Sequence, residues 1–304
     1  MAQIRFLTAD VFTDRAFTGN PLAVVPDARG LDARRMQLVA REFDYSETTF
    51  VFPAEDRRHT RRVRIFTPAA EIPFAGHPTL GTAFVLAAIG EIPLTGEETR
   101  IVLEEGAGPV PVTIRAGAGR PTSCELAAPK LPERGPEAPP PEAIAAALSL
   151  SPGDLAGGEW RAEVFSCGLP FLFVPLRSLE AVARARIDHG RWSPLGRALG
   201  VTGVHVFTLE TQSPAADVHA RMFAPDAGVP EDPATGAASA ALAGVLAPRD
   251  RRQGATLRWV IEQGLEMGRP SRIVVEADRE GGRLTAVRVG GAAVLVSEGR
   301  MEVP

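Results

Sequence analysis

The sequence predicts an α+β protein built from two similar halves, and three observations support this. Its 304 residues, with 45% hydrophobic and 23% charged side chains, form a globular chain longer than one compact core usually needs. Short alternating apolar segments outnumber helical ones. Several motifs also recur in the same order in the second part of the chain. We therefore expect two pseudo-symmetric domains, each a strand-rich sheet wrapped around a central helix.

Four pairs of motifs carry the repeat. They are Gly19–Pro26 with Gly168–Pro175, Arg64–Pro73 with Arg221–Pro230, His77–Gly81 with Asp232–Gly236, and Glu105-Gly106 with Gln263-Gly264. The second member follows the first at a nearly constant distance, 149 residues for the first pair and 158 for the last. Four matches in one order favour a tandem duplication over coincidence.

The elements of the first half follow from apolar periodicity and turn residues. We expect strands at Ile4–Val11, Leu22–Val25, Thr48–Phe52, Arg100–Leu103, Val110–Arg115 and Thr122–Leu126, and helices at Asp32–Phe43, capped by Asp32, and Thr79–Ile89. The second half repeats the plan. We expect strands at Ala162–Ser166, Phe171–Val174, Val204–Leu209, Arg272–Ala277, Leu284–Val289 and Ala292–Val296, and helices at Leu179–Arg186, Trp192–Gly200 and Thr235–Leu246.

A proline-rich segment near the middle of the chain, Pro129–Pro141, indicates where the halves join. Proline fixes φ and lacks an N–H donor, so this stretch cannot hold a helix or a central strand. We interpret it as a linker, with a long surface loop as the alternative. The predicted domains are 1–135 and 145–304, and the last strand is a candidate to cross back to the first domain.

Charge and residue usage exclude several classes of protein. The formal net charge of −4 supplies no basic field for phosphates, so no nucleic-acid partner is expected. Two cysteines exclude a disulfide scaffold, and five histidines without short ligand spacing argue against a metal site.

Nothing in the sequence predicts a membrane or a secretory destination. Arg5 and Asp10 interrupt the stretch that a signal peptide would need to keep apolar. The longest apolar runs are too short to span a bilayer. We therefore expect a soluble cytoplasmic protein without a membrane partner.

Two proline-containing motifs each open a helix rich in small residues. Pro78 suits the first helical position, which would make His77 the cap, and Asp232 is the expected cap of the second helix. Gly76, Gly81 and Gly236 would let a ligand approach the backbone closely. Exposed N–H groups at a helix start bind carboxylate or phosphate, so we expect a small anionic ligand between the two starts, in an interdomain cleft. The alternative is a pair of capped helices without a ligand.

Glu47 is the candidate acid/base. It lies between hydroxyl residues, among them Ser46 and Thr48, just before a strongly apolar strand, and a carboxyl in a partly apolar cleft has a raised pKa. His77 is a second candidate proton carrier. Each has an ordinary alternative: a surface glutamate at a strand start, and a histidine hydrogen-bonded into its loop. The alternative for Asp232 is a plain helix cap.

Several motifs together resemble the PhzF family of phenazine-biosynthesis-like isomerases. They are Asp10–Val25, Ser46-Glu47-Thr48, Arg64–Pro68, Phe74–Pro78, Glu231–Gly236 and Gln263-Gly264 followed by Gly268–Ser271. The resemblance runs from about Phe6 to the C-terminus and implies the diaminopimelate-epimerase-like fold. It also implies proton-transfer chemistry without cofactor or metal, and a homodimer.

The resemblance assigns roles to individual residues. It implies that Glu47 is the acid/base and that His77 and Asp232 bind substrate and assist the proton. Gly76 and Gly236 would contribute backbone donors, and Ser46 belongs to the same motif as Glu47. One departure is Ala237, which stands where the phenazine enzyme of the family has serine. Losing that hydroxyl removes one substrate hydrogen bond, worth about 1 kcal/mol.

Three functions remain open at this point. The first is a cofactor-independent isomerase that moves a proton on a small carboxylate-bearing substrate. The second is an epimerase or racemase of an amino or hydroxy acid, for which His77 is the available second base. The third is a non-catalytic protein that binds a small acid, which the Ala237 departure favours.

Overall fold

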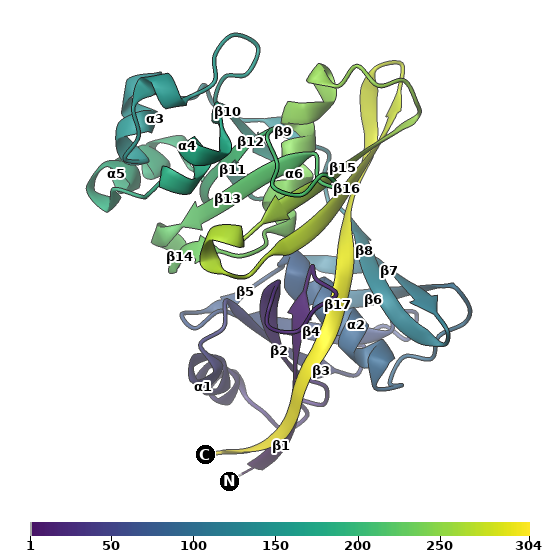
Figure 1. The fold of residues 1–304 in the computed structure, drawn as a ribbon. Coiled ribbons are helices and arrows are strands. Elements are labelled where there is room, and N and C mark those ends of the chain that lie inside the picture. Colours follow the sequence, from purple (N-terminus) through teal and green to yellow (C-terminus); the bar gives the residue numbers. More distant parts are fainter. Residues whose placement is uncertain (1) are drawn as a thin grey trace. The chain divides into compact units, whose positions relative to one another are not determined.

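A computed structural model describes residues 2–304 of the protein, and Figure 1 shows its course. The chain divides into two compact units. Unit 1 comprises the residues up to Ala127 together with Gly290–Pro304, and unit 2 comprises Ala128–Val289. The strand β17 (Arg283–Val303) therefore belongs to unit 2 by its first residues and to unit 1 by the rest.

Unit 1 is a strand-rich sheet with two helices. Its elements are β1 (Ala2–Val11), β2 (Asn20–Val25), α1 (Ala33–Phe43), β3 (Glu47–Phe52), β4 (Arg61–Phe66), β5 (Glu71–Ile72), α2 (Gly76–Ala88), β6 (Glu98–Glu105), β7 (Gly108–Gly117) and β8 (Arg120–Ala127). β1 pairs with β2 and with β17, so both ends of the chain lie side by side (Figure 1). β2 and β3 run parallel, and β4 joins β3 to β6.

The two helices of unit 1 have opposite characters. α2 is apolar or small on every side, and all but its last residue are buried against β1, β2, β3, β7 and β8. A helix without a polar face must be surrounded by protein. α1 is amphipathic and packs only one side, with Met36, Val39 and Ala40, against a cluster that includes Phe50 and Phe66. α2 is thus the central helix that the sequence predicts.

Unit 2 repeats this plan with more helices. Its elements are β9 (Glu133–Arg134), α3 (Pro141–Ala147), β10 (Glu163–Ser166), β11 (Pro170–Pro175), α4 (Leu179–Arg184), α5 (His189–Leu199), β12 (Gly203–Thr208), β13 (Val218–Ala224), β14 (Val229–Asp232), α6 (Gly236–Leu246), β15 (Thr256–Gln263) and β16 (Ser271–Glu280). α6 is the buried counterpart of α2, and it contacts β9, β10, β11 and β16. α3, α4 and α5 cluster beyond the other sheet face and cover an aliphatic core that contains Trp192 (Figure 1).

Strand registers establish the duplication residue by residue. In unit 1, Leu22 of β2 pairs with Glu47 of β3, and in unit 2 Phe171 of β11 pairs with Gly203 of β12. The next strands agree, since Ile65 lies opposite Ile72 and Met222 lies opposite Asp232. The two motifs E-x-P-x-x-G that begin at Glu71 and Glu231 therefore correspond, and Gly76 and Gly236 each open the central helix.

This correspondence corrects the predicted alignment of the third motif pair, His77–Gly81 with Asp232–Gly236. The sequence motifs align His77 with Asp232, whereas the strand registers align His77 with Ala237 and Ile72 with Asp232. The connection from β13 to β14 is longer than that from β4 to β5 and contains the 3-10 turn Pro225–Ala227. The added residues change the offset within the motif.

Both predicted helix caps are wrong as well. The N-cap of α2 is Ala75, so His77 and Pro78 lie inside the first turn. The N-cap of α6 is Thr235, and Asp232 ends β14 instead. Proline is tolerated throughout the first helical turn, where its missing N–H would have no partner, so it does not mark the first position uniquely.

The strands differ from prediction in two further ways. Leu284–Val289 and Ala292–Val296 form one continuous strand, β17, because Gly290 and Gly291 keep an extended backbone. Strands β4, β13 and β15 are absent from the predicted set, and so are the short strands β5, β9 and β14. β13 is buried along its whole length yet contains His219 and Arg221, so neither an alternating nor a uniformly apolar pattern marks it.

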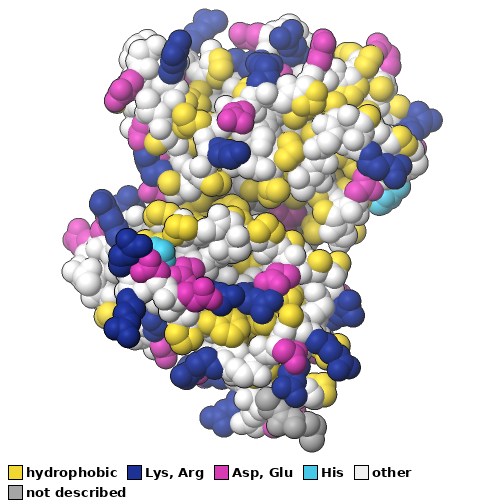
Figure 2. All heavy atoms as spheres, turned by 180° about the vertical axis from the view of Figure 1, so that it is seen from behind, with side chains coloured by type: hydrophobic (Ala, Val, Ile, Leu, Met, Phe, Trp, Pro, Cys, Tyr) yellow, Lys and Arg dark blue, Asp and Glu magenta, His cyan; other side chains and the backbone are white. Residues whose placement is uncertain are grey.

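The surface carries both signs of charge. Figure 2 shows basic side chains, nearly all of them arginine, interspersed with aspartate and glutamate over the face in view, with groups of hydrophobic side chains between them. Among residues 2–304, no helix has both the length and the apolar character needed to cross a membrane.

Candidate active site

Glu47 is the first residue of β3, and this end of the strand lies beside the start of α2. The chain reaches it from α1 through Asp44, which adopts the left-handed conformation as the C-cap of that helix. The Glu47 side chain is mostly buried, with 14% of its surface exposed. Ser46 precedes the strand and is partly exposed. The turn after α1 and the pairing with β2 thus fix the carboxyl in position.

His77 is the second residue of α2, and its imidazole is 5% exposed. The ring forms a hydrogen bond to the backbone of Pro21, and since proline has no N–H, the ring donates and the carbonyl accepts. Nε2 forms no hydrogen bond, so Nδ1 is the donor. Burial lowers the pKa of His77 to about 3, and the Pro21 bond offsets only part of that effect. The ring is therefore neutral at physiological pH, with the lone pair of Nε2 available.

That lone pair faces Glu47. The distance from Nε2 of His77 to Oε2 of Glu47 is 3.5 Å. This is longer than a well-formed hydrogen bond, and catalytic contacts in ligand-free sites are often long. A protonated Glu47 carboxyl could donate to Nε2. The structure thus brings together two of the predicted site residues, with Gly76 next to His77 in the first turn of the helix.

Asp232 belongs to unit 2, where it is buried at the end of β14. Its Oδ2 accepts a hydrogen bond of 2.5 Å from the hydroxyl of Thr235, the N-cap of α6. Gly236 and Ala237 are the first two residues of that helix. The predicted anion site at the start of α6, and the contribution of these three residues to substrate binding, stay predictions.

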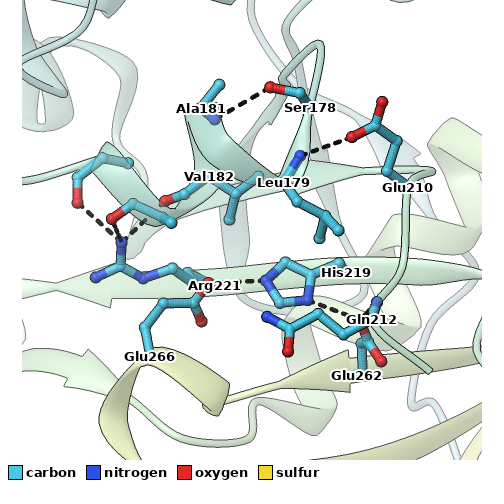
Figure 3. A network of polar contacts seen from close by, with 12 residues as sticks. Ser178, Leu179, Ala181, Val182, Glu210, Gln212, His219, Arg221, Glu262 and Glu266 are labelled. Carbon is cyan, nitrogen blue, oxygen red and sulfur yellow. Dashed lines mark hydrogen bonds and ion pairs between the residues drawn. The ribbon is translucent and has the colours of Figure 1, made fainter.

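Buried Arg221 supports the strand that carries Asp232, and Figure 3 shows Arg221 in its network of polar contacts. Arg221 of β13 is 3% exposed and donates from Nε and Nη2 to Glu231, the neighbour of Asp232, at 2.8 and 2.9 Å. Its Nη1 donates to carbonyl groups at the end of α4, those of Val182, Ala183 and Ala185. A guanidinium can satisfy all these acceptors at once because its donors form a planar fork.

His219 lies in the same network, between two carboxylates. Nδ1 is 2.8 Å from Glu262 and Nε2 is 2.8 Å from Glu266, and the ring is fully buried (Figure 3). Burial lowers its pKa, but the hydrogen bonds to Glu266 and Glu262 outweigh that effect, so the pKa of His219 is raised overall. The surroundings thus shift the pKa of His77 in unit 1 down and the pKa of His219 in unit 2 up.

Several residues near the candidate site were not singled out in the sequence analysis. Pro21 orients His77, and Thr79 and Thr235 hydrogen-bond at the helix starts. Glu105 and Gln263 appeared only as markers of the repeat, although a polar residue before glycine at the end of a buried strand was a usable signal. The Glu105 side chain contacts Thr79, and the Gln263 side chain contacts Thr235.

The described residues, 2–304, contain no group of three His, Cys, Asp or Glu side chains gathered to hold a metal ion. Both cysteines are buried, and burial raises the pKa of the Cys167 thiol to about 12 and also raises that of Cys124. Neither thiol is activated as a nucleophile. Cofactor independence stays a prediction.

Comparisons with known proteins agree over nearly the whole chain. The model of the family described as phenazine biosynthesis-like protein, PhzC-PhzF, matches residues 9–299. A protein from Mesorhizobium japonicum named as an uncharacterized isomerase is 43% identical, over 97% of this chain and 98% of its own. The trans-2,3-dihydro-3-hydroxyanthranilate isomerase of Pseudomonas aeruginosa is 37% identical, over 97% and 98%.

A solved structure shows the same architecture. The phenazine biosynthesis protein of the PhzF family from Bacillus anthracis superposes with a TM-score of 0.90 over the full length of both chains, at 27% identity. The predicted fold class, two pseudo-symmetric units of the diaminopimelate-epimerase-like kind, is confirmed. The chain belongs to the phenazine biosynthesis-like, or PhzF, family and is an isomerase of that family.

Proposed function

We propose that the protein moves a proton on a small carboxylate-bearing substrate, with Glu47 as the acid/base and without a cofactor. The observation that carries this proposal is the contact between the Glu47 carboxyl and the neutral imidazole of His77. A carboxyl held in a mostly buried position beside a neutral acceptor is suited to take up a proton and return it.

The chemistry follows from these two groups. Glu47 removes a proton from a carbon next to a conjugated system, and the electron pair of the C–H bond moves into that system. The lone pair of His77 Nε2 stabilises the protonated carboxyl. The carboxyl then delivers its proton, which has exchanged with solvent in part of the turnovers, to another carbon. Substrate and product contain the same atoms and electrons, so the step needs no oxidant or reductant. Backbone donors such as the N–H groups at the start of α2 stabilise the negative charge that develops.

The duplication weighs against an epimerase with two equivalent bases. Gly203 and Ala237 occupy the positions of Glu47 and His77 in unit 2. A Cβ atom at Gly203 would lie 2.5 Å from the carbonyl oxygen of Phe223, so that position tolerates no side chain. The second unit therefore holds no counterpart of the acid/base.

The substrate is best tested with the compound named for a relative. The protein is incubated with trans-2,3-dihydro-3-hydroxyanthranilate in D₂O, and the deuterium content of the product is followed by mass spectrometry. We expect turnover with deuterium incorporation at a carbon. Glu47→Gln should lower the rate by about 10²- to 10⁴-fold, the usual contribution of a general acid/base. Glu42→Gln, an exposed glutamate of α1, is the matched control and should leave the rate unchanged.

Two results would oppose the proposal. If Glu47→Gln kept full activity and full deuterium exchange, a catalytic role of Glu47 would be excluded. Binding of the compound in calorimetry by the parent chain, without any exchange, would favour a non-catalytic binding protein.

A further inference from the structure

Glu105, the last residue of β6, is a buried carboxyl for which the proposed reaction has no use. It is 8% exposed, and its Oε2 has no hydrogen-bond partner. Its Oε1 lies 2.6 Å from the hydroxyl oxygen of Thr79. The same hydroxyl oxygen lies 2.7 Å from the carbonyl oxygen of Ala75, the N-cap of α2. Three oxygen atoms thus form a short chain that ends at the residue before Gly76 and His77.

The number of protons available along this chain favours a protonated Glu105. Two short oxygen–oxygen contacts require one proton each. The Ala75 carbonyl has none to give, and the Thr79 hydroxyl has one, which cannot lie on both lines. The hydroxyl is the donor in both contacts when Glu105 is ionised, so one of them then lacks a proton. A protonated Glu105 supplies it, by donating from Oε1 to the hydroxyl while the hydroxyl donates to Ala75.

The charged groups around Glu105 provide no reason for it to ionise. The charged side chains on the neighbouring strands and loops are paired elsewhere: Arg61 with Glu91, Arg62 with Glu55, Arg64 with Glu71, Arg115 with Glu98, and His59 with Glu104. α2 carries one titratable side chain, the neutral His77. Burial raises the pKa of Glu105 to about 8.

In unit 2 the position of Glu105 is occupied by a glutamine, Gln263, whose side chain carries no charge at any pH. Gln263 corresponds to Glu105, as the parallel strand pairs show. In unit 1, Arg61 of β4 lies opposite Leu103 of β6, and in unit 2, Val218 of β13 lies opposite Ile261 of β15. Two residues further along, β6 reaches Glu105 and β15 reaches Gln263. Its amide donates to the hydroxyl of Thr235 and to the carbonyl of Asp232, and its Oε1 accepts from the Thr235 N–H. The glycine that follows packs on the proline before the helix in each unit, Gly106 on Pro73 and Gly264 on Pro233. Both units thus use this position to hold the N-cap residue of the central helix.

We propose that Glu105 is a positioning residue that acts in its protonated form, holding Ala75 through Thr79 and thereby fixing the helix start that presents His77 to Glu47. Ionisation of Glu105 would turn the Thr79 hydroxyl towards the carboxylate and release the Ala75 carbonyl. The first turn of α2 would then loosen. The consequence for catalysis rests on the proposed function, whereas the protonation state and its effect on the helix do not.

The first test is spectroscopic and needs no substrate. The infrared difference spectrum between the parent and Glu105→Gln, recorded at pH 7, should contain the C=O stretch of a protonated carboxyl. That band should disappear as the pH rises through about 8. A carboxylate signal in its place at pH 7 would overturn the proposal.

The second test measures the helix start by amide hydrogen exchange of residues 76–80. Glu105→Gln retains a donor to Thr79 and should keep the protection of the parent and make it independent of pH. Glu105→Leu and Thr79→Val should each lower protection about tenfold, the equivalent of one buried hydrogen bond. Equal protection in Glu105→Gln and Glu105→Leu would reduce Glu105 to an ordinary core residue.

The kinetic test uses trans-2,3-dihydro-3-hydroxyanthranilate. The parent should lose kcat above about pH 8, and Glu105→Gln should not, while Thr79→Ser retains the decline because its hydroxyl remains. A decline of the same size in Glu105→Gln would contradict the role in positioning His77. If the compound is not converted at all, the proposed function fails, and the spectroscopic and exchange tests still decide the state of Glu105.

Discussion

Unit 1 and unit 2 place different residues at the same positions of one strand pattern. Glu47 and His77 correspond to Gly203 and Ala237, and conversely Asp232 corresponds to Ile72. The scaffold residues Glu71 and Glu231, with their arginine partners, are retained in both. A duplicated fold has therefore kept its support in both copies and the proposed proton-carrying pair, Glu47 and His77, in one.

The retained support itself differs between the units. Arg64 and Glu71 form a pair that water reaches, with 23% and 41% of their side chains exposed. Arg221 and Glu231 form the same pair with 3% and 19% exposed, and Arg221 also closes the end of α4. The buried version is more costly to disturb because an unpaired charge would remain in the interior.

Removing these arginines should give the largest difference between the units. Arg221→Met should lower the free energy of unfolding by about 3–5 kcal/mol, since it leaves Glu231 without its partner. Arg64→Met should cost about 1 kcal/mol or less. Urea unfolding followed by circular dichroism measures both. Similar losses of unfolding free energy in the two variants would contradict the expected difference between the buried and the exposed ion pair.

Asp232→Asn tests whether unit 2 contributes a carboxylate to substrate binding. If Asp232 binds substrate as a carboxylate, the change should raise KM by an amount equivalent to about 1.5–3 kcal/mol, the range for a charged hydrogen bond. The asparagine can still accept from Thr235, so stability should change little. Ile72→Val, at the matching position of unit 1, is the control. An effect on kcat with KM unchanged would assign Asp232 to the proton transfer instead.

The contribution of His219 to the free energy of unfolding should depend on pH. The raised pKa of His219 means that the folded state holds a proton that the unfolded chain releases at lower pH. Its stabilisation is therefore full below the unfolded pKa, about 6.5, and is lost as the pH rises through the folded value. His219→Gln should cost more stability at pH 6 than at pH 9 in urea unfolding. A cost that does not vary with pH would mean that folding leaves the pKa of His219 unchanged, and a smaller cost at pH 6 would mean that folding lowers it.

The smallest expected effect is that of Ala237→Ser. The added hydroxyl, in the first turn of α6, should improve kcat/KM for trans-2,3-dihydro-3-hydroxyanthranilate by the equivalent of about 1 kcal/mol. Steady-state kinetics of parent and variant decide the point. No change, or a loss, would indicate that this chain does not hold that substrate as the phenazine enzyme does.

The sequence predicts the central helices, most strands and the duplication because these depend on local periodicity and on motifs that recur in order. It cannot place an insertion within a repeat, which is why His77 was aligned with Asp232 instead of Ala237. It also misses β13, whose buried His219 and Arg221 are satisfied by glutamates distant in the sequence. The role of Glu105 depends on a hydroxyl twenty-six residues away, and only the fold brings the two together.

The most direct test of a single acid/base in unit 1 follows the fate of the transferred hydrogen. Trans-2,3-dihydro-3-hydroxyanthranilate labelled with deuterium at one or the other saturated ring carbon is converted in H₂O in a single turnover. If Glu47 both removes and returns the proton from its mostly buried position, part of the label from the reacting carbon should reappear at a new carbon of the product. Complete loss of that label to solvent from both preparations would contradict transfer by one shielded carboxyl.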